Sequence, residues 1–367
     1  MVTIRVRNRY MDANDRGKEH GMNITSSDFG VANGEPVKLY TMQNKKGMKV
    51  EVLNFGGIIR SIYIPKRGKL VDVVLGYENI DGYVSDVFCF GALIGRNANR
   101  IKNATFTLDG VSYELEQNEK GNNLHSSHMN GYHKRIWDVE CDEENNRLIL
   151  TLESPDMDQG FPGNCKIKVE YTLAEDNSLE VQYEAISDKK TVFNMTNHMY
   201  LNLKGHDGGE IYDHQLLIKS PAFTEIAEDC VPTGKIVQVA GTPMDFNRPR
   251  KVGEFIGADD EQIKRGNGYD HNWVLAKETS SIEKVAEMYE DSLGIRLEVF
   301  TDRPGIQFYS GNGLSSIPGK DGVIYNQCAG FCLETQFYPN SVNESSFPSP
   351  VIGADTVVRT TTVYKFI

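Results

Sequence analysis

Apolar and polar side chains alternate along many short segments of the chain. The alternation is clearest over Arg147–Glu153, Lys166–Leu173, Arg296–Thr301 and Thr361–Ile367. Because successive side chains of a β-strand point to opposite faces of a sheet, a period of two predicts strands with one buried and one solvated face. The same pattern over Lys49–Phe55 extends the prediction toward the start of the chain. We therefore expect a protein built mainly from short strands.

Two of these strands are predicted to form a hairpin around Asp109-Gly110. Alternating runs flank this dipeptide on both sides, over Thr105–Leu108 and Val111–Leu115. The pair Asp-Gly accepts the positive φ angles that a tight hairpin turn requires. A turn at residues 175–177 separates two further alternating runs. Strands joined in this way favour antiparallel pairing.

Helix-like segments are few. Asp259–Arg265 predicts one short helical turn, whereas Ser281–Glu290 fits the spacing of a helix and of a strand equally well. We favour a strand there because its neighbours are strands. No regular alternation of strands with helices occurs, which disfavours a parallel α/β sheet. The predicted fold class is all-β, a large antiparallel β-sandwich with few short helices, in which a concave sheet face can be lined with polar groups that hold a ligand.

The beginning of the chain differs from the rest in its pattern. It carries Asn, Asp, Gly, Ser and Lys without sustained periodicity. We expect residues 1–34 to form a loosely ordered arm, with a short strand possible at Val2–Val6. Residues 35–367 are expected to form a single domain. The length of 367 residues does not exclude this, because chain length is only a soft guide to the number of domains.

Composition narrows the location and the partners. Residues 1–30 lack the apolar stretch of a secretory signal, and no run approaches the roughly 20 apolar residues of a membrane-spanning helix. The six cysteines form no dense framework in so long a chain, so we expect reduced thiols in a cytoplasmic protein. The 51 acidic and 39 basic side chains give a net charge of -12. This charge disfavours nucleic acid and membranes as partners, because both require a basic protein face.

Several familiar motifs are missing. The sequence contains no phosphate-binding Gly-rich loop before a Lys-Ser/Thr pair and no Gly-x-Ser-x-Gly nucleophile elbow. His125, His128 and His133 lie close together in the sequence, but their spacing matches no standard metal site and no cysteine lies nearby. We therefore expect neither a metal nor a cofactor.

Two segments place an ionisable side chain among unusual neighbours. If Asn194–Leu203 is a strand, Thr196, His198, Tyr200 and Asn202 share one face, which suits a hydrated pocket better than a core. Glu334 lies in a largely apolar stretch. Its carboxylate is either exposed on an edge strand or buried with partners, because an isolated buried charge is very costly.

Six sequence blocks, taken together, resemble the aldose 1-epimerase (galactose mutarotase) family. They occur in the family's order and with compatible spacing, from about residue 35 to residue 367. The resemblance implies a large β-sandwich with a sugar site on its concave sheet. The blocks are Gly95–Ile101, Asn123–His125, Asn197–Leu203, Gly268–His271, Gln307–Asn312 and Leu333–Glu334.

The resemblance implies interconversion of the α and β anomers of a free hexose such as galactose or glucose. The sugar ring must open, the C1–C2 bond must turn and the ring must close again, which needs a general acid and a general base. The matching positions are Glu334 as base and His198 as acid. Sugar-binding roles fall on His125, Asp270, Arg100, Asn99 and Gln307. The partner is then a free monosaccharide, with no metal or cofactor, and the protein a monomer or homodimer.

Two alternatives remain open at this stage. A hexose-6-phosphate 1-epimerase needs basic residues aimed at a phosphate, and Arg96 and Arg100 are the candidates. A non-catalytic sugar-binding protein would keep the pocket without the reaction. One departure from the family bears on substrate preference, because Ser126-Ser127 follows His125 where two glycines are usual.

Overall fold

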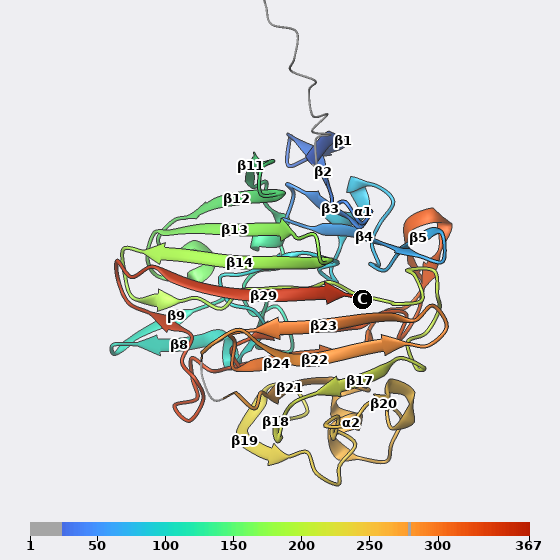
Figure 1. Ribbon diagram of the computed structural model, residues 1–367. Helices are drawn as coiled ribbons and strands as arrows, with labels where there is room; N and C mark the ends of the chain where they lie inside the picture. The colour runs from blue at the N-terminus through green and yellow to red at the C-terminus, as the bar shows by residue number, and fades with distance from the viewer. Residues whose placement is uncertain (1–23, 278–279) are drawn as a thin grey trace, which may run out of the picture.

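The computed structural model describes residues 24–277 and 280–367. Its broadest element is a nine-stranded antiparallel sheet that forms one layer of the molecule (Figure 1). In spatial order its strands are β11 (Asp138–Asp142), β12 (Arg147–Ser154), β13 (Cys165–Leu173), β14 (Ser178–Ser187), β29 (Val358–Phe366), β23 (Ile295–Thr301), β22 (Glu283–Glu290), β17 (Gln215–Ile218) and β20 (Arg250–Lys251).

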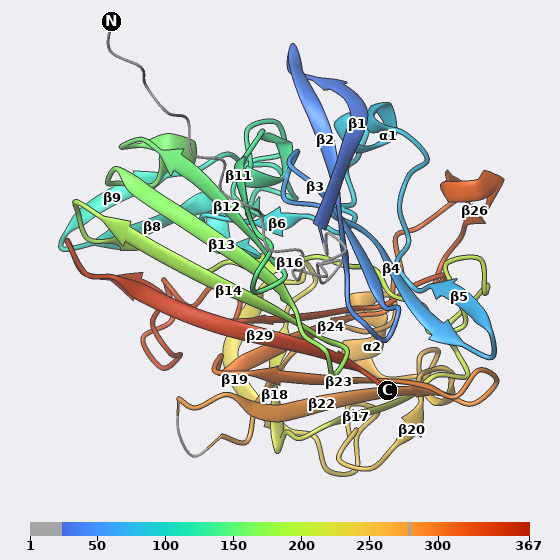
Figure 2. The same ribbon diagram turned by 45° about the horizontal axis from the view of Figure 1, so that its top comes forward.

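A five-stranded antiparallel sheet forms the layer behind it, as the turned view shows (Figure 2). Side chains of both sheets, among them Trp273, Phe308 and Leu297, belong to one hydrophobic core between them. The second sheet carries the candidate site on its other face. Its strands, in spatial order, are β19 (Pro232–Gln238), β18 (Ala222–Ile226), β21 (Asp270–Val274), β24 (Gly305–Tyr309) and β27 (Cys332–Gln336).

A third sheet of five strands packs at one end of the sandwich and contains the first residues of the described chain. The remaining strands form short two-stranded pairs, which connect the layers. The third sheet consists of β1 (Ile24–Ala32), β2 (Glu35–Gln43), β3 (Lys49–Leu53), β4 (Ile59–Lys66) and β5 (Lys69–Asp72). The pairs are β6 (Leu93–Ile94) with β16 (Thr196–Asn197), β7 (Arg100–Ile101) with β10 (Asn123–Leu124), β8 (Thr105–Leu108) with β9 (Val111–Glu114), β15 (Thr191–Val192) with β28 (Val351–Ile352), and β25 (Ile317–Pro318) with β26 (Ile324–Tyr325).

The predicted all-β sandwich is confirmed. The alternation of buried and outward-facing side chains along its strands explains why the sequence forms sheets. Along β13 the apolar residues Ile167, Val169 and Tyr171 are buried on one face. The side chain of Lys168 lies between them in sequence, on the outer face, where it forms ion pairs with Glu170 and Glu184. Each strand of the large sheet can thus contribute one face to the core and one to solvent.

The local predictions also hold at the hairpin and in the ambiguous segment. Asp109 and Gly110 join β8 to β9 with φ angles of 50° and 81°. Residues 281–290 contain the strand β22, as favoured. The predicted helical turn is α2 (Glu261–Gly266), which begins after Asp260, whose carboxylate accepts hydrogen bonds from the backbone of the first turn.

Two local predictions need correction, and one helix was not predicted. The last part of the predicted arm, residues 24–34, is not loose, because β1 pairs with β2 from Ile24 to Ala32, with one irregularity between Asp28 and Gly30. The predicted strand at Val2–Val6 lies outside the described residues. A second helix, α1 (Ile80–Ser85), has no predicted counterpart, because six residues are too few to show a period. The segment 194–203 is not one strand, since only Thr196–Asn197 is assigned to β16.

None of the helices in the described part of the chain is long and apolar enough to cross a membrane.

A buried ion pair joins the third sheet to the segment before β26. The Nζ atom of Lys320 lies 2.6 Å from a carboxylate oxygen of Asp72 and also donates hydrogen bonds to the carbonyl of Arg60 and the hydroxyl of Ser61. Side-chain exposure is 2% for Lys320 and 9% for Asp72. Water therefore cannot replace a missing partner, and each charge depends on the other.

We predict that Lys320→Ala lowers the free energy of unfolding by about 3–5 kcal/mol, because the Asp72 carboxylate stays buried without its cation. Urea denaturation at neutral pH measures the change. The matched control is Lys251→Ala, which removes an exposed ion pair with Asp213 and should change the stability far less, because solvent screens exposed pairs. Equal losses for the two variants would contradict the prediction.

Candidate active site

The strand register of the second sheet gathers polar side chains on one face. Gln307 of β24 lies opposite Glu334 of β27, and Asp270, Tyr309 and Cys332 form the adjacent row across β21, β24 and β27. Because side chains alternate along each strand, these residues share the face opposite to the one that enters the core. A site on this face therefore rests on paired strands rather than on a mobile loop.

His198 reaches this face from the short segment that follows β16. Its backbone is fixed on both sides, since its N–H donates to the carbonyl of Ala92 and its carbonyl accepts from the N–H of Gly91. The imidazole Nε2 lies 3.6 Å from Oε1 of Glu334, and both side chains are almost fully buried. At 3.6 Å this is a close contact rather than a hydrogen bond. The pair therefore has hydrogen-bonding positions that are free for a ligand. Within residues 24–277 and 280–367, Oε2 of Glu334 has no hydrogen-bond partner.

His125 approaches the pair from the loop after β10. Its ring centre lies 5.3 Å from that of His198. The backbone N–H of Asn99 donates to Nδ1 of His125 at 3.1 Å. Because Nδ1 accepts this bond, the neutral ring carries its proton on Nε2 and is a fixed hydrogen-bond donor.

Ser126 helps to hold this loop. Its backbone is in the left-handed region, with a φ of 68°, and its hydroxyl bridges the main chain of Asn97 by accepting from the N–H and donating to the carbonyl. The hydroxyl of the next residue, Ser127, accepts a hydrogen bond from the N–H of Asn130. The two serines thus fix the loop beside His125 where glycines would leave these bonds unmade.

A chain of charge-assisted contacts lies next to the histidines. Arg100 forms two hydrogen bonds to Glu119, at 2.6 and 2.8 Å, and a longer ion pair of 3.4 Å with Asp270. The Nε2 of Gln307 donates to the other carboxylate oxygen of Asp270 at 2.7 Å. Burial works against the charge of Arg100, but Asp270 and Glu119 raise its pKa, so the guanidinium stays charged.

Burial controls the protonation of the central pair. It lowers the pKa of His198 to about 4, although a hydrogen bond with the residue's own carbonyl and the charge of Asp270 act in the opposite direction. It raises the pKa of Glu334 well above the ordinary range, and Asp270 raises it further, while Arg100 lowers it. Near neutral pH the uncharged forms are favoured, so the pair holds one exchangeable proton. The charge of Asp270 favours the imidazolium form of His198, but burial outweighs it.

His125 remains neutral as well. Burial lowers its pKa well below the ordinary value, and the neighbouring His198 and Arg100 lower it further. A histidine in this state cannot act as a cation toward a ligand. Its Nε2–H is instead a neutral donor of fixed position.

These side chains line a cavity of about 180 Å³. The volume is below the range of roughly 300–1,000 Å³ that is typical of pockets for drug-sized ligands, so it fits a small molecule. The lining residues are Val87, Phe88, Cys89, Asn99, Arg100, Glu119, Leu124, His125, His128, His133, His198, Tyr200, Asp270, Tyr309 and Glu334.

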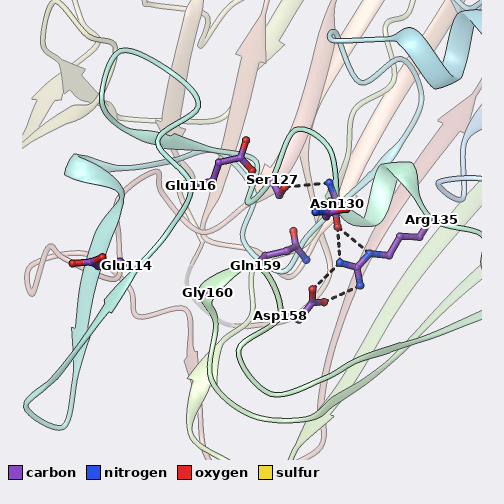
Figure 3. A pocket seen from close by; sticks show the side chains of 8 residues that line it. All are labelled: Glu114, Glu116, Ser127, Asn130, Arg135, Asp158, Gln159 and Gly160. Atoms are coloured by element: carbon purple, nitrogen blue, oxygen red, sulfur yellow. Dashed lines mark hydrogen bonds and ion pairs between the residues drawn. The ribbon is translucent and has the colours of Figure 1, made fainter.

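A second cavity, of about 480 Å³, lies nearby and shares the segment 124–135 with the first (Figure 3). Its main polar contact is the ion pair of Arg135 with Asp158, which leaves neither charge free for a ligand. None of its lining residues is a histidine. Although larger, this cavity therefore lacks a proton-transfer pair. It is lined by Glu114, Glu116, Ser127, Asn130, Arg135, Asp158, Gln159 and Gly160.

The three groups His125, His198 and Glu334 have the spacing of a possible metal site, since one ligand atom from each lies within 4.8 Å of the others. The tautomer of His125 argues against that use. Its Nδ1 lone pair already accepts from Asn99, and its Nε2 carries the proton, so the neutral ring offers a metal no free lone pair. Proton transfer suits this set of groups better than metal binding. The three histidines that stand close together in the sequence, His125, His128 and His133, all line the cavity.

Six of the seven residues singled out in the sequence line the cavity: Glu334, His198, His125, Asp270, Arg100 and Asn99. Gln307 is not among its lining residues and reaches it through Asp270. Of the four side chains predicted to share a strand face, only His198 and Tyr200 line it. The amide of Asn202 instead donates to the carbonyls of Gly209 and Ala329.

Other residues of the cavity were not found by sequence reasoning, and one candidate lies elsewhere. Tyr309 lies in the block Gln307–Asn312, but nothing in its local sequence marks it as a cavity residue, and the same is true of Cys89 and Glu119. Arg96 is fully buried away from the cavity, where it donates to the carbonyls of Pro162 and Gly163. The sequence alone cannot show that Arg96 lies outside the cavity whereas Arg100, four residues later, lines it.

Comparison with known proteins agrees with this geometry. The aldose 1-epimerase family model matches residues 38–365. Galactose mutarotase from Bos taurus is 37% identical over 349 residues, which cover 94% of this chain and 99% of the relative. Aldose 1-epimerase from Escherichia coli K12 is 34% identical over 318 residues, 86% of this chain and 91% of the relative.

Solved structures give the same result. An aldose epimerase homologue from C. elegans superposes with a TM-score of 0.82 at 29% identity, covering 94% of this chain and 99% of that one. Galactose 1-epimerase from Lactobacillus acidophilus gives a TM-score of 0.82 at 26% identity with the same coverage. The resemblance found in the sequence is therefore confirmed: the chain belongs to the aldose 1-epimerase family.

Proposed function

We propose that the protein is an aldose 1-epimerase, an isomerase that interconverts the α and β anomers of free hexoses such as D-galactose and D-glucose without a cofactor. The observation that carries the proposal is the contact of Glu334 with His198, a carboxyl group and an imidazole that face each other in one small cavity. Family membership supports the reaction class, and relatives that are named galactose mutarotase support the choice of sugar.

In the proposed mechanism the proton held by the pair first moves from Glu334 to Nε2 of His198. The carboxylate of Glu334 then removes the proton of the C1 hydroxyl while Nε2 of His198 protonates the ring oxygen. The bond between C1 and the ring oxygen breaks, and an open-chain aldehyde forms. After rotation about the C1–C2 bond the two groups exchange roles, and the ring closes on the other face of the aldehyde. No net proton is consumed. A pair that shares one proton in its resting state is suited to this exchange.

The remaining candidate residues are proposed to bind the sugar hydroxyls. The neutral Nε2–H of His125 would donate to one oxygen, and Arg100 with Asp270 supplies both a donor and an acceptor for others. Gln307 would act through Asp270, to which its Nε2 donates a hydrogen bond. Asn99 lines the same cavity.

The alternative of a hexose-6-phosphate 1-epimerase has no support in the charge of the cavity. Arg96 points elsewhere, and the charge of Arg100 is already compensated by Glu119 and Asp270. Among the described lining residues no uncompensated arginine or lysine remains for a phosphate. A non-catalytic sugar-binding protein would need the same cavity but no proton-transfer pair, and is disfavoured by the presence of the pair.

We also propose that β1 and residues 35–367 together form a single domain, and that the protein is a cytoplasmic monomer or homodimer. All six cysteines are free thiols, which supports a reducing compartment.

The function is tested by dissolving crystalline α-D-galactose and following its optical rotation with and without the protein. We expect the protein to accelerate the approach to equilibrium. Galactose 6-phosphate, added at increasing concentration, should compete weakly, because its phosphate finds no free cation. An unchanged rate would reject the reaction, and sugar binding by calorimetry without acceleration would instead select the sugar-binding alternative.

Loss of either proton-transfer group should abolish most of the activity. Glu334→Gln and His198→Asn are each expected to lower kcat by about 100-fold or more, the usual scale for general acid–base residues. The matched control is His214→Gln, which replaces a buried histidine that accepts from the N–H of Leu203 away from the cavity. Polarimetry on folded variants measures the effect, and near wild-type activity would remove that residue from the mechanism.

The shared proton predicts a displaced pH profile. Below about pH 4, His198 is protonated while Glu334 is still protonated. The pair then contains no base, and kcat/KM falls. Above the raised pKa of Glu334 the pair loses its only exchangeable proton, no acid remains, and kcat/KM falls again. Polarimetry between these limits should show a plateau. An acid limb near the ordinary histidine value of about 6.5 would contradict this assignment.

A further inference from the structure

The second nitrogen of the His198 ring has a partner of its own. Sγ of Cys332 lies 3.5 Å from Nδ1 of His198, and Oε1 of Glu334 lies 3.6 Å from Nε2. Cys332 and Glu334 are two residues apart on β27, so both side chains point to the same face. One strand thus contacts both nitrogens of the proposed acid.

We propose that Cys332 is a positioning residue, whose sulfur accepts a hydrogen bond from Nδ1–H of His198 and so keeps Nε2 as the nitrogen that exchanges protons. The proposal rests on the proposed function, because it concerns the roles of the two nitrogens in that reaction. It assigns no covalent chemistry to the thiol.

The catalytic cycle itself requires a proton on Nδ1. Nε2 must carry a proton when His198 acts as an acid and must be bare when it acts as a base. The acid form is the imidazolium, in which both nitrogens are protonated, and the base form is then the neutral ring with its proton on Nδ1. In both forms Nδ1 is a donor, so its partner must accept.

The surroundings of Cys332 suit this role. The residue is fully buried and is not among those lining the cavity, so it has no access to a sugar. Burial raises the pKa of its thiol well above the ordinary value, so the group is neutral. A neutral sulfur is a weak acceptor, which orients the ring without stabilising the imidazolium as a carboxylate would.

The contact is held by the backbone on both sides. Leu201 and Phe331 exchange two backbone hydrogen bonds, of 2.8 and 2.9 Å, next to the segment of His198 and immediately before Cys332.

The reverse arrangement, with the thiol donating to a bare Nδ1, would place the proton of the neutral ring on Nε2. Proton donation from that form would leave an imidazolate, which is too basic to form in a side chain near neutral pH. Exchange at Nε2 would then require a change of tautomer in every cycle. The arrangement with sulfur as acceptor avoids this step.

The test is ¹⁵N NMR of the full chain with labelled histidine, without sugar, at neutral pH. The His198 signals are identified by their loss in His198→Asn. We expect Nδ1 of the wild type to show the shift of a protonated nitrogen and Nε2 that of a bare one. A wild-type ring protonated on Nε2 would overturn the proposal. The measurement does not depend on activity, so it stands apart from a failure of the proposed function.

The variants Cys332→Ala and Cys332→Ser test the consequence for catalysis. Loss of the acceptor in Cys332→Ala should give a mixture of tautomers and about a 3- to 10-fold lower kcat with unchanged KM, the scale of one hydrogen bond. Cys332→Ser keeps an acceptor and should recover part of the rate. Cys165→Ala, a buried cysteine of β13 outside the cavity, is the control and should change neither quantity.

An unchanged tautomer and an unchanged kcat in Cys332→Ala would overturn the proposal. Equal losses in kcat for Cys332→Ala and Cys165→Ala would also overturn it, because they would show a general packing effect. If Cys332→Ala does not fold, the wild-type tautomer and the serine variant decide.

Discussion

Burial of the Glu334 carboxyl group against the His198 imidazole is the constraint around which the site is organised. Removing a carboxylate and an imidazolium from water is costly, and the two groups escape the cost by sharing one proton. The same burial sets the pKa of each group away from its ordinary value and makes the exchange of that proton local. Burial of this pair therefore accounts both for the structure of the site and for its proposed chemistry.

The fold meets this constraint by combining two kinds of support. Glu334 sits on a strand whose neighbours are fixed by continuous hydrogen bonding, so its row with Gln307 cannot shift without moving the core on the other face. His198 lies outside regular strands, but its backbone bonds to Gly91 and Ala92 hold it as firmly. The imidazole is therefore brought to the sheet by a segment far away in the sequence.

Much of the sheet architecture could be predicted from the sequence, because strands such as β13 carry their burial pattern in a strict period of two. β1 could not, since the pairing of this strand leaves nearly all of its residues exposed or half-exposed. No alternation of apolar residues then marks it. The same lack of a local signal explains the error at residues 194–203, where all side chains are buried and a period has no meaning.

The site was predictable only in part. The blocks around His125, His198, Asp270 and Glu334 came from resemblance to a family, not from periodicity. What the sequence could not show was the set of long-range partners. The contact of Asn99 with Nδ1 of His125, which makes that ring a donor, joins residues whose roles cannot be read from their neighbours. The different positions of the Arg96 and Arg100 side chains likewise depend on carbonyl and carboxylate partners that are far away in the sequence.

The place of β29 in the large sheet has a consequence for synthesis. This strand lies between β14 and β23, yet the ribosome delivers it after every other strand of that sheet. Until it arrives, the two halves of the sheet expose facing edges with unsatisfied backbone groups, the feature by which nascent chains associate wrongly. The insertion of β29 thus joins two unpaired sheet edges into one continuous sheet.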